Sequence, residues 1–251
     1  MPVLTFHKVD PAFEWGATRL SPERFRRILF HLKDHGFTGA TLAKVLDSNS
    51  ASSRSLALTF DDGYQSLWTF ARPVMLKAGF TGTIFVITDF IGRLNTWDVN
   101  LGGRLFRHLD WNQIRDFVRN GFEIGSHTAS HPDLTALTDR RLKDELTRSK
   151  AVLEDKTGKP VRFLSFPFGR HNRRVVEASR ETGYERGMAF WRRPQSDPDG
   201  FVAETRAVYS FDPVASIPFK FKDGIRGRAE AFKQRAINTC SWGCMIVKPS
   251  N

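Results

Sequence analysis

The stretch Leu56-Ala57-Leu58-Thr59-Phe60-Asp61-Asp62-Gly63 is an apolar run that ends in two carboxylates and a glycine. Such a run is typical of a buried strand in a parallel sheet, and α/β folds place their chemistry at the carboxyl ends of these strands. Side chains alternate along an extended segment, so one carboxylate can bind a metal while the other takes a proton. Taken alone, the pair favours a plainer interpretation, in which one Asp caps the helix that follows.

A second polar stretch, Gly125-Ser126-His127-Thr128-Ala129-Ser130-His131-Pro132, contains two histidines four positions apart. On a single helical turn, such a pair can present both imidazoles to one cation, and a carboxylate from another strand can complete the site. Three protein ligands leave a position open for water, which is typical of a catalytic metal site. An isolated H-x-x-x-H motif is weak evidence, because surface histidines also pair by chance.

A third stretch, Phe163-Leu164-Ser165-Phe166-Pro167-Phe168-Gly169, follows these two. Together the three motifs resemble the polysaccharide deacetylases of the NodB-homology type, carbohydrate esterase family 4. The resemblance extends from about residue 3 to the 180s. It implies an α/β fold, a distorted (β/α) barrel that is complete or incomplete, with seven or eight parallel strands.

The resemblance also implies roles for individual residues. Asp61 corresponds to the general base, and Asp62, His127 and His131 correspond to the ligands of a divalent metal. The metal polarises an amide carbonyl, and metal-bound water attacks it once the base removes a proton. The backbone N–H of Phe168, just after Pro167, would help to hold the oxyanion. Two imidazoles and a carboxylate suit zinc best, and cobalt, nickel or iron also fit these ligands.

The chain departs from the family pattern at two places. Many members have an arginine that orients the catalytic Asp at the position of Ser165, and the family's late histidine is missing, since His171 is the last histidine. A subgroup that includes poly-N-acetylglucosamine deacetylases also commonly lacks this arginine, and it opens with a strand that ends in histidine. The segment from Val3 to His7 resembles that strand. We therefore expect His7 either to protonate the leaving group or support Asp61, or to be an ordinary histidine at a strand end.

Residues 89–110 form an irregular segment with Trp97 near its middle. A long loop at a sugar-binding rim can present an aromatic ring that stacks on a pyranose. Trp97 is therefore a candidate substrate contact. The alternative, a hydrophobic plug beneath the loop, is the favoured interpretation of this residue.

The apolar pattern elsewhere alternates strands with helices, which favours parallel pairing. We expect one domain over residues 1–251, with residues 191–251 the part that is hardest to assign. Strands are expected at 3–6, 82–88, 162–166 and 184–190, and helices at 22–36, 67–77, 111–121, 138–156, 173–182 and 227–239. Pro73 falls inside the second of these helices.

The chain of 251 residues has a formal net charge of +11 and a pI near 10.0. Its basic residues occur as scattered pairs without a basic tail, so no nucleic-acid partner is expected. If the positive charge has a function, it favours binding to an anionic membrane surface or a phosphate-bearing glycolipid.

The sequence also bears on location. No apolar run is long enough to span a membrane, and the first eight residues lack the features of a secretion signal. We therefore expect a cytoplasmic enzyme, free or membrane-associated. Cys240 and Cys244 suggest no metal site, and the oligomeric state stays open.

The leading functional hypothesis is a metal-dependent hydrolase that removes N-acetyl groups from the sugars of a polysaccharide, an oligosaccharide or a lipid-linked glycan. One alternative is a catalytically silent carbohydrate-binding protein of the same fold. Another is an enzyme that keeps the metal site and acts on a non-sugar amide or an O-acetyl ester. The motifs describe the reacting centre, whereas specificity lies in the loops.

Overall fold

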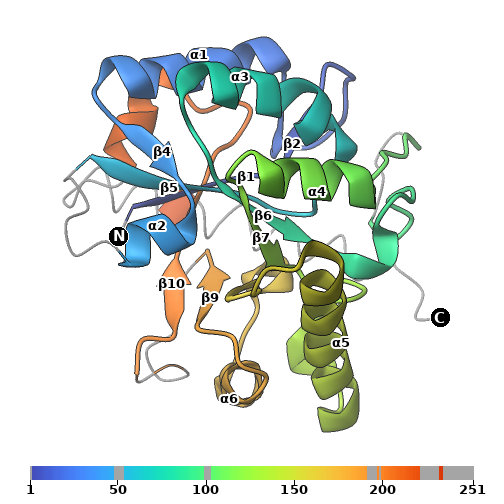
Figure 1. The fold of residues 1–251 in the computed structure, drawn as a ribbon. Coiled ribbons are helices and arrows are strands. Elements are labelled where there is room, and N and C mark those ends of the chain that lie inside the picture. The colour runs from blue at the N-terminus through green and yellow to red at the C-terminus, as the bar shows by residue number, and fades with distance from the viewer. Residues whose placement is uncertain are drawn as a thin grey trace.

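The computed structural model describes residues 2–47, 54–98, 103–190, 197, 199–220 and 232–233. Its main element is a parallel sheet in the order β10-β9-β8-β7-β6-β5-β1-β11, with β4 paired to β5 off this path (Figure 1). The strands are β1 (Val3–Phe6), β4 (Thr38–Ala40), β5 (Ser55–Phe60), β6 (Thr83–Val86), β7 (Glu123–Ser126), β8 (Phe163–Ser165), β9 (Arg186–Ala189), β10 (Val202–Glu204) and β11 (Arg206–Ala207).

The sheet is nearly closed into a barrel, because its two ends are consecutive pieces of chain. β10 pairs with β9, β11 pairs with β1, and only Thr205 separates them. The backbone N–H of Thr205 donates to Ala189 O at 2.9 Å, and that of Val208 donates to Thr5 O at 2.9 Å. Eight strands lie on the path around the barrel, so the predicted distorted barrel with parallel strands is confirmed.

Helices cover the outside of the sheet. They are α1 (Pro22–Asp34), α2 (Leu42–Asp47), α3 (Arg72–Ala78), α4 (Trp111–Arg119), α5 (Asp139–Thr157) and α6 (Arg173–Glu181). Figure 1 shows α1 and α3 side by side above the sheet, with α5 and α6 below it. Short helical turns are η2 (Thr88–Phe90), η3 (Leu134–Ala136), η4 (Pro167–Gly169) and η6 (Val214–Phe219).

Local sequence signals explain where the longer helices begin and end. Ser21 caps α1 by accepting from Arg24 N at 3.2 Å, and Pro22 opens the helix, where a missing N–H costs nothing. The buried face of α1 consists of Phe25, Ile28, Leu29 and Leu32. Helix α5 starts after Thr138 and stops at Gly158, which has a left-handed backbone with φ 64. Both predicted helices are confirmed.

The region predicted as one helix over 67–77 contains two kinds of helix. Leu67–Ala71 is the π-helix η1, and α3 follows with Pro73 in its first turn. Proline lacks an N–H, so it fits the start of a helix far better than the middle. The expectation of helix despite Pro73 is confirmed, with a change of helix type that the sequence pattern did not indicate.

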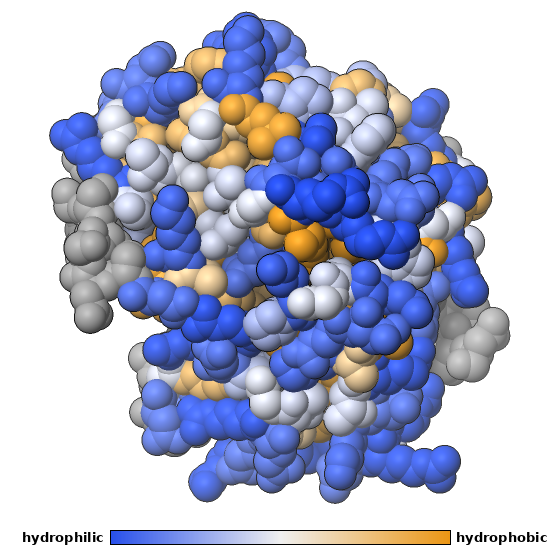
Figure 2. Space-filling model, viewed as in Figure 1, coloured by the Kyte–Doolittle hydropathy of each residue, from blue (hydrophilic) through white to orange (hydrophobic). Residues whose placement is uncertain are grey.

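Several features lie outside these expectations. The sequence did not predict six short elements: strand β4, helix α2, the paired strands β2 (Lys8–Val9) and β3 (Arg19–Leu20), and strands β10 and β11. The helix expected over 227–239 and the two cysteines lie outside the described residues, except for residues 232–233. Among the described residues, the longest apolar helices fall short of what a membrane crossing requires. Figure 2 shows one face covered mostly by hydrophilic residues, with hydrophobic residues in small patches.

Candidate active site

The residues singled out from sequence gather at the carboxyl ends of parallel strands. Asp61 and Asp62 follow β5, His127 follows β7, and the Pro167–Gly169 turn follows β8. His7 follows β1, which pairs with β5. Because all these strands run in the same direction, their ends lie at one edge of the barrel. The fold therefore brings together three motifs that are distant in sequence.

Three of these residues form a buried cluster whose ligand atoms all lie within 4.8 Å of one another: Asp62, His127 and His131. Asp62 Oδ1 lies 3.5 Å from His127 Nε2 and 3.8 Å from His131 Nε2. The two Nε2 atoms are 3.1 Å apart. One carboxylate and two imidazoles are the donor types that bind zinc and related divalent cations, and these side chains already converge on a common point.

The histidine pair does not lie on a helical turn, so that local prediction is wrong. Thr128 and His131 have left-handed backbones, with φ 67 and φ 62, which a right-handed helix excludes. Glu145 on α5 holds this segment in place. Its carboxylate accepts from the backbone N–H groups of Ala129 and Ser130, each at 2.9 Å, and from Ser130 Oγ at 2.6 Å.

His127 has a fixed orientation. Its Nδ1 lies 2.8 Å from the carbonyl oxygen of Ser165 on the neighbouring strand β8. A carbonyl only accepts, so Nδ1 carries the proton and Nε2 is left with its lone pair toward Asp62. This tautomer is the one that a metal ligand needs, and the donor set therefore fits a divalent cation.

The charged groups shift one another's protonation. Burial opposes ionisation of Asp62, but its hydrogen bond with His127 and the neighbouring histidines lower the pKa of its carboxyl well below the usual range. Burial would lower the pKa of His127, but the carboxylates of Asp62 and Asp61 outweigh it and raise that pKa. A carboxylate that stays ionised in a buried site is suited to hold a cation.

Asp61 faces a different environment from Asp62. Its Oδ2 accepts from Ser165 Oγ at 3.3 Å, and its Oδ1 is buried without a hydrogen-bond partner among the described residues. Burial is the main cause that raises the pKa of Asp61, against the lowering effect of His127 and His7. Nδ1 of His7 is likewise buried without a partner among the described residues, and its ring stacks on Phe190 at 6.2 Å.

Two aromatic rings lie against His131. The Trp97 ring centroid is 4.1 Å from that of His131, and the Phe168 centroid is 4.7 Å away in an edge-to-face contact. Phe168 follows Pro167 with a left-handed backbone at φ 58, and it is one of four non-glycine residues with positive φ among the described residues. Trp97 is half-buried and lies beside the candidate metal site, a position that fits a substrate contact as well as a hydrophobic plug beneath the loop.

Sequence reasoning missed two polar residues that contact the site. Glu145 was assigned only to a helix, and His108 received no role. His108 is 1% exposed, and its Nδ1 lies 2.8 Å from the carbonyl oxygen of Asp62. No sequence motif identifies either residue, because the hydrogen bonds of Glu145 with Ser130 and of His108 with Asp62 span 15 or more positions in the chain.

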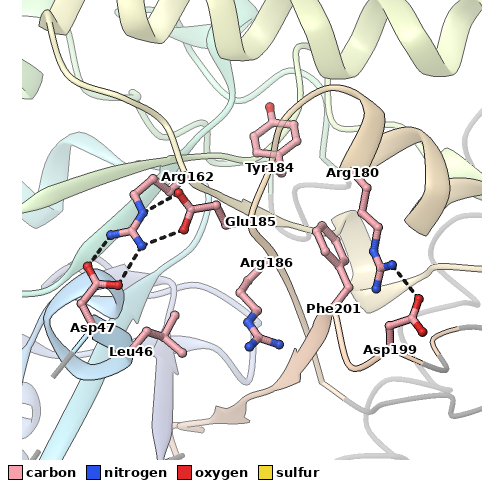
Figure 3. Close-up of a pocket in the computed structure, with 9 residues that line it drawn as sticks. All are labelled: Leu46, Asp47, Arg162, Arg180, Tyr184, Glu185, Arg186, Asp199 and Phe201. Carbon is pink, nitrogen blue, oxygen red and sulfur yellow. Dashed lines mark hydrogen bonds and ion pairs between the residues drawn. The ribbon is translucent and has the colours of Figure 1, made fainter. Parts of the chain in front are cut away.

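A separate pocket of about 460 Å³ lies at the opposite, amino-terminal ends of β8, β9 and β10 (Figure 3). Its charged side chains are largely paired with one another. Arg162 donates to Asp47 and Glu185 at 2.6 to 2.8 Å, and Arg180 donates to Asp199 at 2.7 Å. Most charged groups that line the pocket are thus satisfied by one another, and none of the residues predicted for catalysis lines it.

Comparisons with known proteins agree with this geometry. The sequence pattern described as polysaccharide deacetylase matches residues 48–187, which is more than half of the chain. The Bacillus subtilis (strain 168) protein YxkH is 27% identical over 214 residues, covering 84% of this chain and 71% of YxkH. The poly-β-1,6-N-acetyl-D-glucosamine N-deacetylase of Staphylococcus epidermidis is 24% identical over 181 residues, covering 67% of this chain and 60% of that enzyme.

A solved structure is also similar. The crystal structure of a polysaccharide deacetylase from Bacillus cereus matches with a TM-score of 0.74 and 26% identity, covering 88% of this chain and 68% of that chain. The likeness therefore extends over the barrel as well as over the three motifs.

Proposed function

Because the chain belongs to the polysaccharide deacetylase family, we propose that it is a metal-dependent hydrolase that removes N-acetyl groups from N-acetylated sugars. Its substrate would be a polysaccharide, an oligosaccharide or a lipid-linked glycan. The observation that carries the proposal is the divergence of two adjacent carboxylates. Asp62 faces His127 and His131, whereas Asp61 faces Ser165. Adjacent residues thus offer a metal ligand and a separate base.

In this proposal, Asp62, His127 and His131 hold the cation, with zinc preferred and cobalt, nickel or iron as substitutes. When bound, the cation supplies Lewis-acid polarisation of the amide carbonyl and lowers the pKa of water toward neutrality. Asp61 accepts the proton of the attacking water. Its Oδ1 is suited to this step, because that atom is buried and has no hydrogen-bond partner among the described residues.

The oxyanion and the leaving amine also need partners. The backbone N–H of Phe168 would donate to the oxyanion, and Pro167 would set the turn that presents it. The amine nitrogen must gain a proton as the carbon–nitrogen bond breaks. His7 is our candidate for that donor, or for a group that supports Asp61. Nδ1 of His7 is buried without a hydrogen-bond partner among the described residues, which supports this assignment. His7 is also close enough to lower the pKa of both Asp61 and Asp62.

The experiment is acetate release from N-acetylglucosamine oligomers. The protein is stripped with a chelator, dialysed, and reloaded with zinc, cobalt or nickel. Release that returns only with metal would support the proposal. Metal binding at unit stoichiometry without release would favour a non-sugar amide or an O-acetyl ester as substrate. Absence of both would favour a silent carbohydrate-binding protein.

Two further proposals concern the binding partners of the protein and its cellular location. The net charge of +11 supports an anionic membrane surface or a phosphate-bearing glycolipid as a partner. Binding to anionic vesicles at low salt, compared with neutral vesicles, would test this point. The cytoplasmic location and the single domain likewise stay predictions.

A further inference from the structure

We propose that His108 is a positioning residue that links the backbone of Asp62 to the indole of Trp97 and so keeps that ring packed on His131. Its effect on turnover rests on the proposed function. Its effect on metal binding does not, because metal binding can be measured without substrate.

Both nitrogens of the His108 ring have partners. Nδ1 lies 2.8 Å from the carbonyl oxygen of Asp62, and Nε2 lies 3.0 Å from Nε1 of Trp97. The carbonyl only accepts and the indole N–H only donates, so Nδ1 carries the proton and Nε2 has the lone pair.

At one end of this link, His108 holds a backbone that is conformationally unusual. Asp62 has φ 68, a left-handed conformation that non-glycine residues rarely adopt, and Gly63 follows with φ 67. This conformation decides where the Asp62 side chain points relative to Asp61. The hydrogen bond from His108 to the Asp62 carbonyl therefore acts on the peptide that orients a metal ligand.

At the other end, the link holds Trp97 over the site. The centroid of the Trp97 ring lies 4.1 Å from that of His131 and 6.4 Å from that of Phe90. Without a partner for its N–H, the indole would have one less constraint on its orientation. Trp97 is half-buried, so the residue is not fully enclosed by the packing around it.

Ring stacking and backbone hydrogen bonds hold His108 in position. Its ring stacks on Tyr64 at 5.0 Å with an interplanar angle of 20°. Its backbone N–H donates to Arg93 O at 2.8 Å, and the next residue, Leu109, donates to Gly63 O at 2.8 Å. The loop that carries Trp97 is thus fastened to the Asp62-Gly63 turn through both backbone and side chain.

Two substitutions separate the two hydrogen bonds. His108→Asn keeps a donor near the position of Nδ1 and loses the acceptor for Trp97. His108→Gln keeps an acceptor near Nε2 and loses the donor to Asp62. We expect His108→Gln to raise the metal dissociation constant of the stripped protein about tenfold, as loss of outer-shell support does. His108→Asn should leave that constant within about twofold and raise KM about fivefold, as for one lost neutral hydrogen bond.

Trp97→Phe should reproduce the KM change of His108→Asn, and the double variant should be no worse than either single one. Tyr64→Phe is the matched control, because it keeps the ring stacked on His108 and removes only the hydroxyl, which accepts a long hydrogen bond from Asn95 Nδ2 at 3.4 Å. It should change neither constant. Thermal melting of each variant shows that it is folded.

Equal loss of metal affinity in the Asn and Gln variants, or no change in either, would overturn the proposal and leave His108 a packing residue. Additive effects of His108→Asn and Trp97→Phe on KM would also overturn it. If the wild-type protein binds metal but releases no acetate from any N-acetylated sugar, the proposed function fails, and the difference in metal affinity still decides the role of His108.

Discussion

Oγ of Ser165 lies 3.3 Å from Oδ2 of Asp61, although the two residues are 104 positions apart. Ser165 ends β8, and its side chain reaches the buried carboxylate that follows β5. The family pattern that the sequence resembles often has an arginine at the position of Ser165. Here a neutral hydroxyl contacts the carboxylate of Asp61 from that position.

Ser165→Ala removes this contact and should lower kcat about fivefold, since a hydrogen bond of this kind contributes about 1 kcal/mol. Metal affinity should not change, because the backbone carbonyl that holds His127 is kept. Steady-state kinetics and metal titration check the two parts. The control is Ser179→Ala, which removes a buried hydroxyl of α6 that, among the described residues, donates to Val175 O of its own helix at 2.7 Å. A fall in metal affinity without a fall in kcat would contradict the assignment.

Glu145→Ala should loosen the segment that carries His131. The carboxylate accepts hydrogen bonds from two backbone N–H groups and one hydroxyl. Its loss leaves the buried N–H of Ala129 and the part-buried donors of Ser130 without this acceptor. We expect a loss of about 2 to 4 kcal/mol in the free energy of unfolding and a metal affinity lower by about tenfold to 100-fold. Urea unfolding and metal titration measure these effects.

The matched control for Glu145→Ala is Glu177→Ala on α6. Glu177 forms an exposed ion pair with Arg173, and such pairs contribute at most about 1 kcal/mol. If Glu145→Ala binds metal as tightly as wild type, the segment does not depend on Glu145.

Metal removal should lower the melting temperature. A ligand that binds only the folded protein stabilises it by about 2.7 kcal/mol at 100 times its dissociation constant, which corresponds to roughly 5 to 10 °C for a chain of this size. Differential scanning calorimetry of stripped and reloaded protein checks this prediction. Asp62→Ala should show no such metal-dependent shift, and a full shift in that variant would place the metal elsewhere.

The sequence predicted the barrel because its strands are short apolar runs bounded by polar residues and its helices carry cap residues such as Ser21 and Gly158. It did not predict β10 and β11, which have three and two residues. Segments this short carry no periodicity. They form strands because β9 and β1 offer open edges on either side of the barrel, which is a tertiary effect.

The sequence predicted which residues form the candidate metal site, but it did not predict the backbone conformation that brings them together. Asp62, His127 and His131 do come together, yet His131 reaches the others through left-handed backbone at Thr128 and at His131 itself. Such a conformation in non-glycine residues has no sequence signal and depends on contacts such as those of Glu145. His108 could not be found either, because its partner Asp62 lies 46 positions away.

The measurement that tests the central claim most directly compares Asp61→Asn with Asp62→Ala, each loaded with zinc, for metal content and for acetate release. We predict that Asp61→Asn retains one metal per chain and loses turnover by about 100-fold to 10,000-fold, because a general base contributes about that factor. We predict that Asp62→Ala loses both the metal and activity. Full acetate release by metal-loaded Asp61→Asn would contradict the account, since the adjacent carboxylates would then not divide the roles of base and ligand.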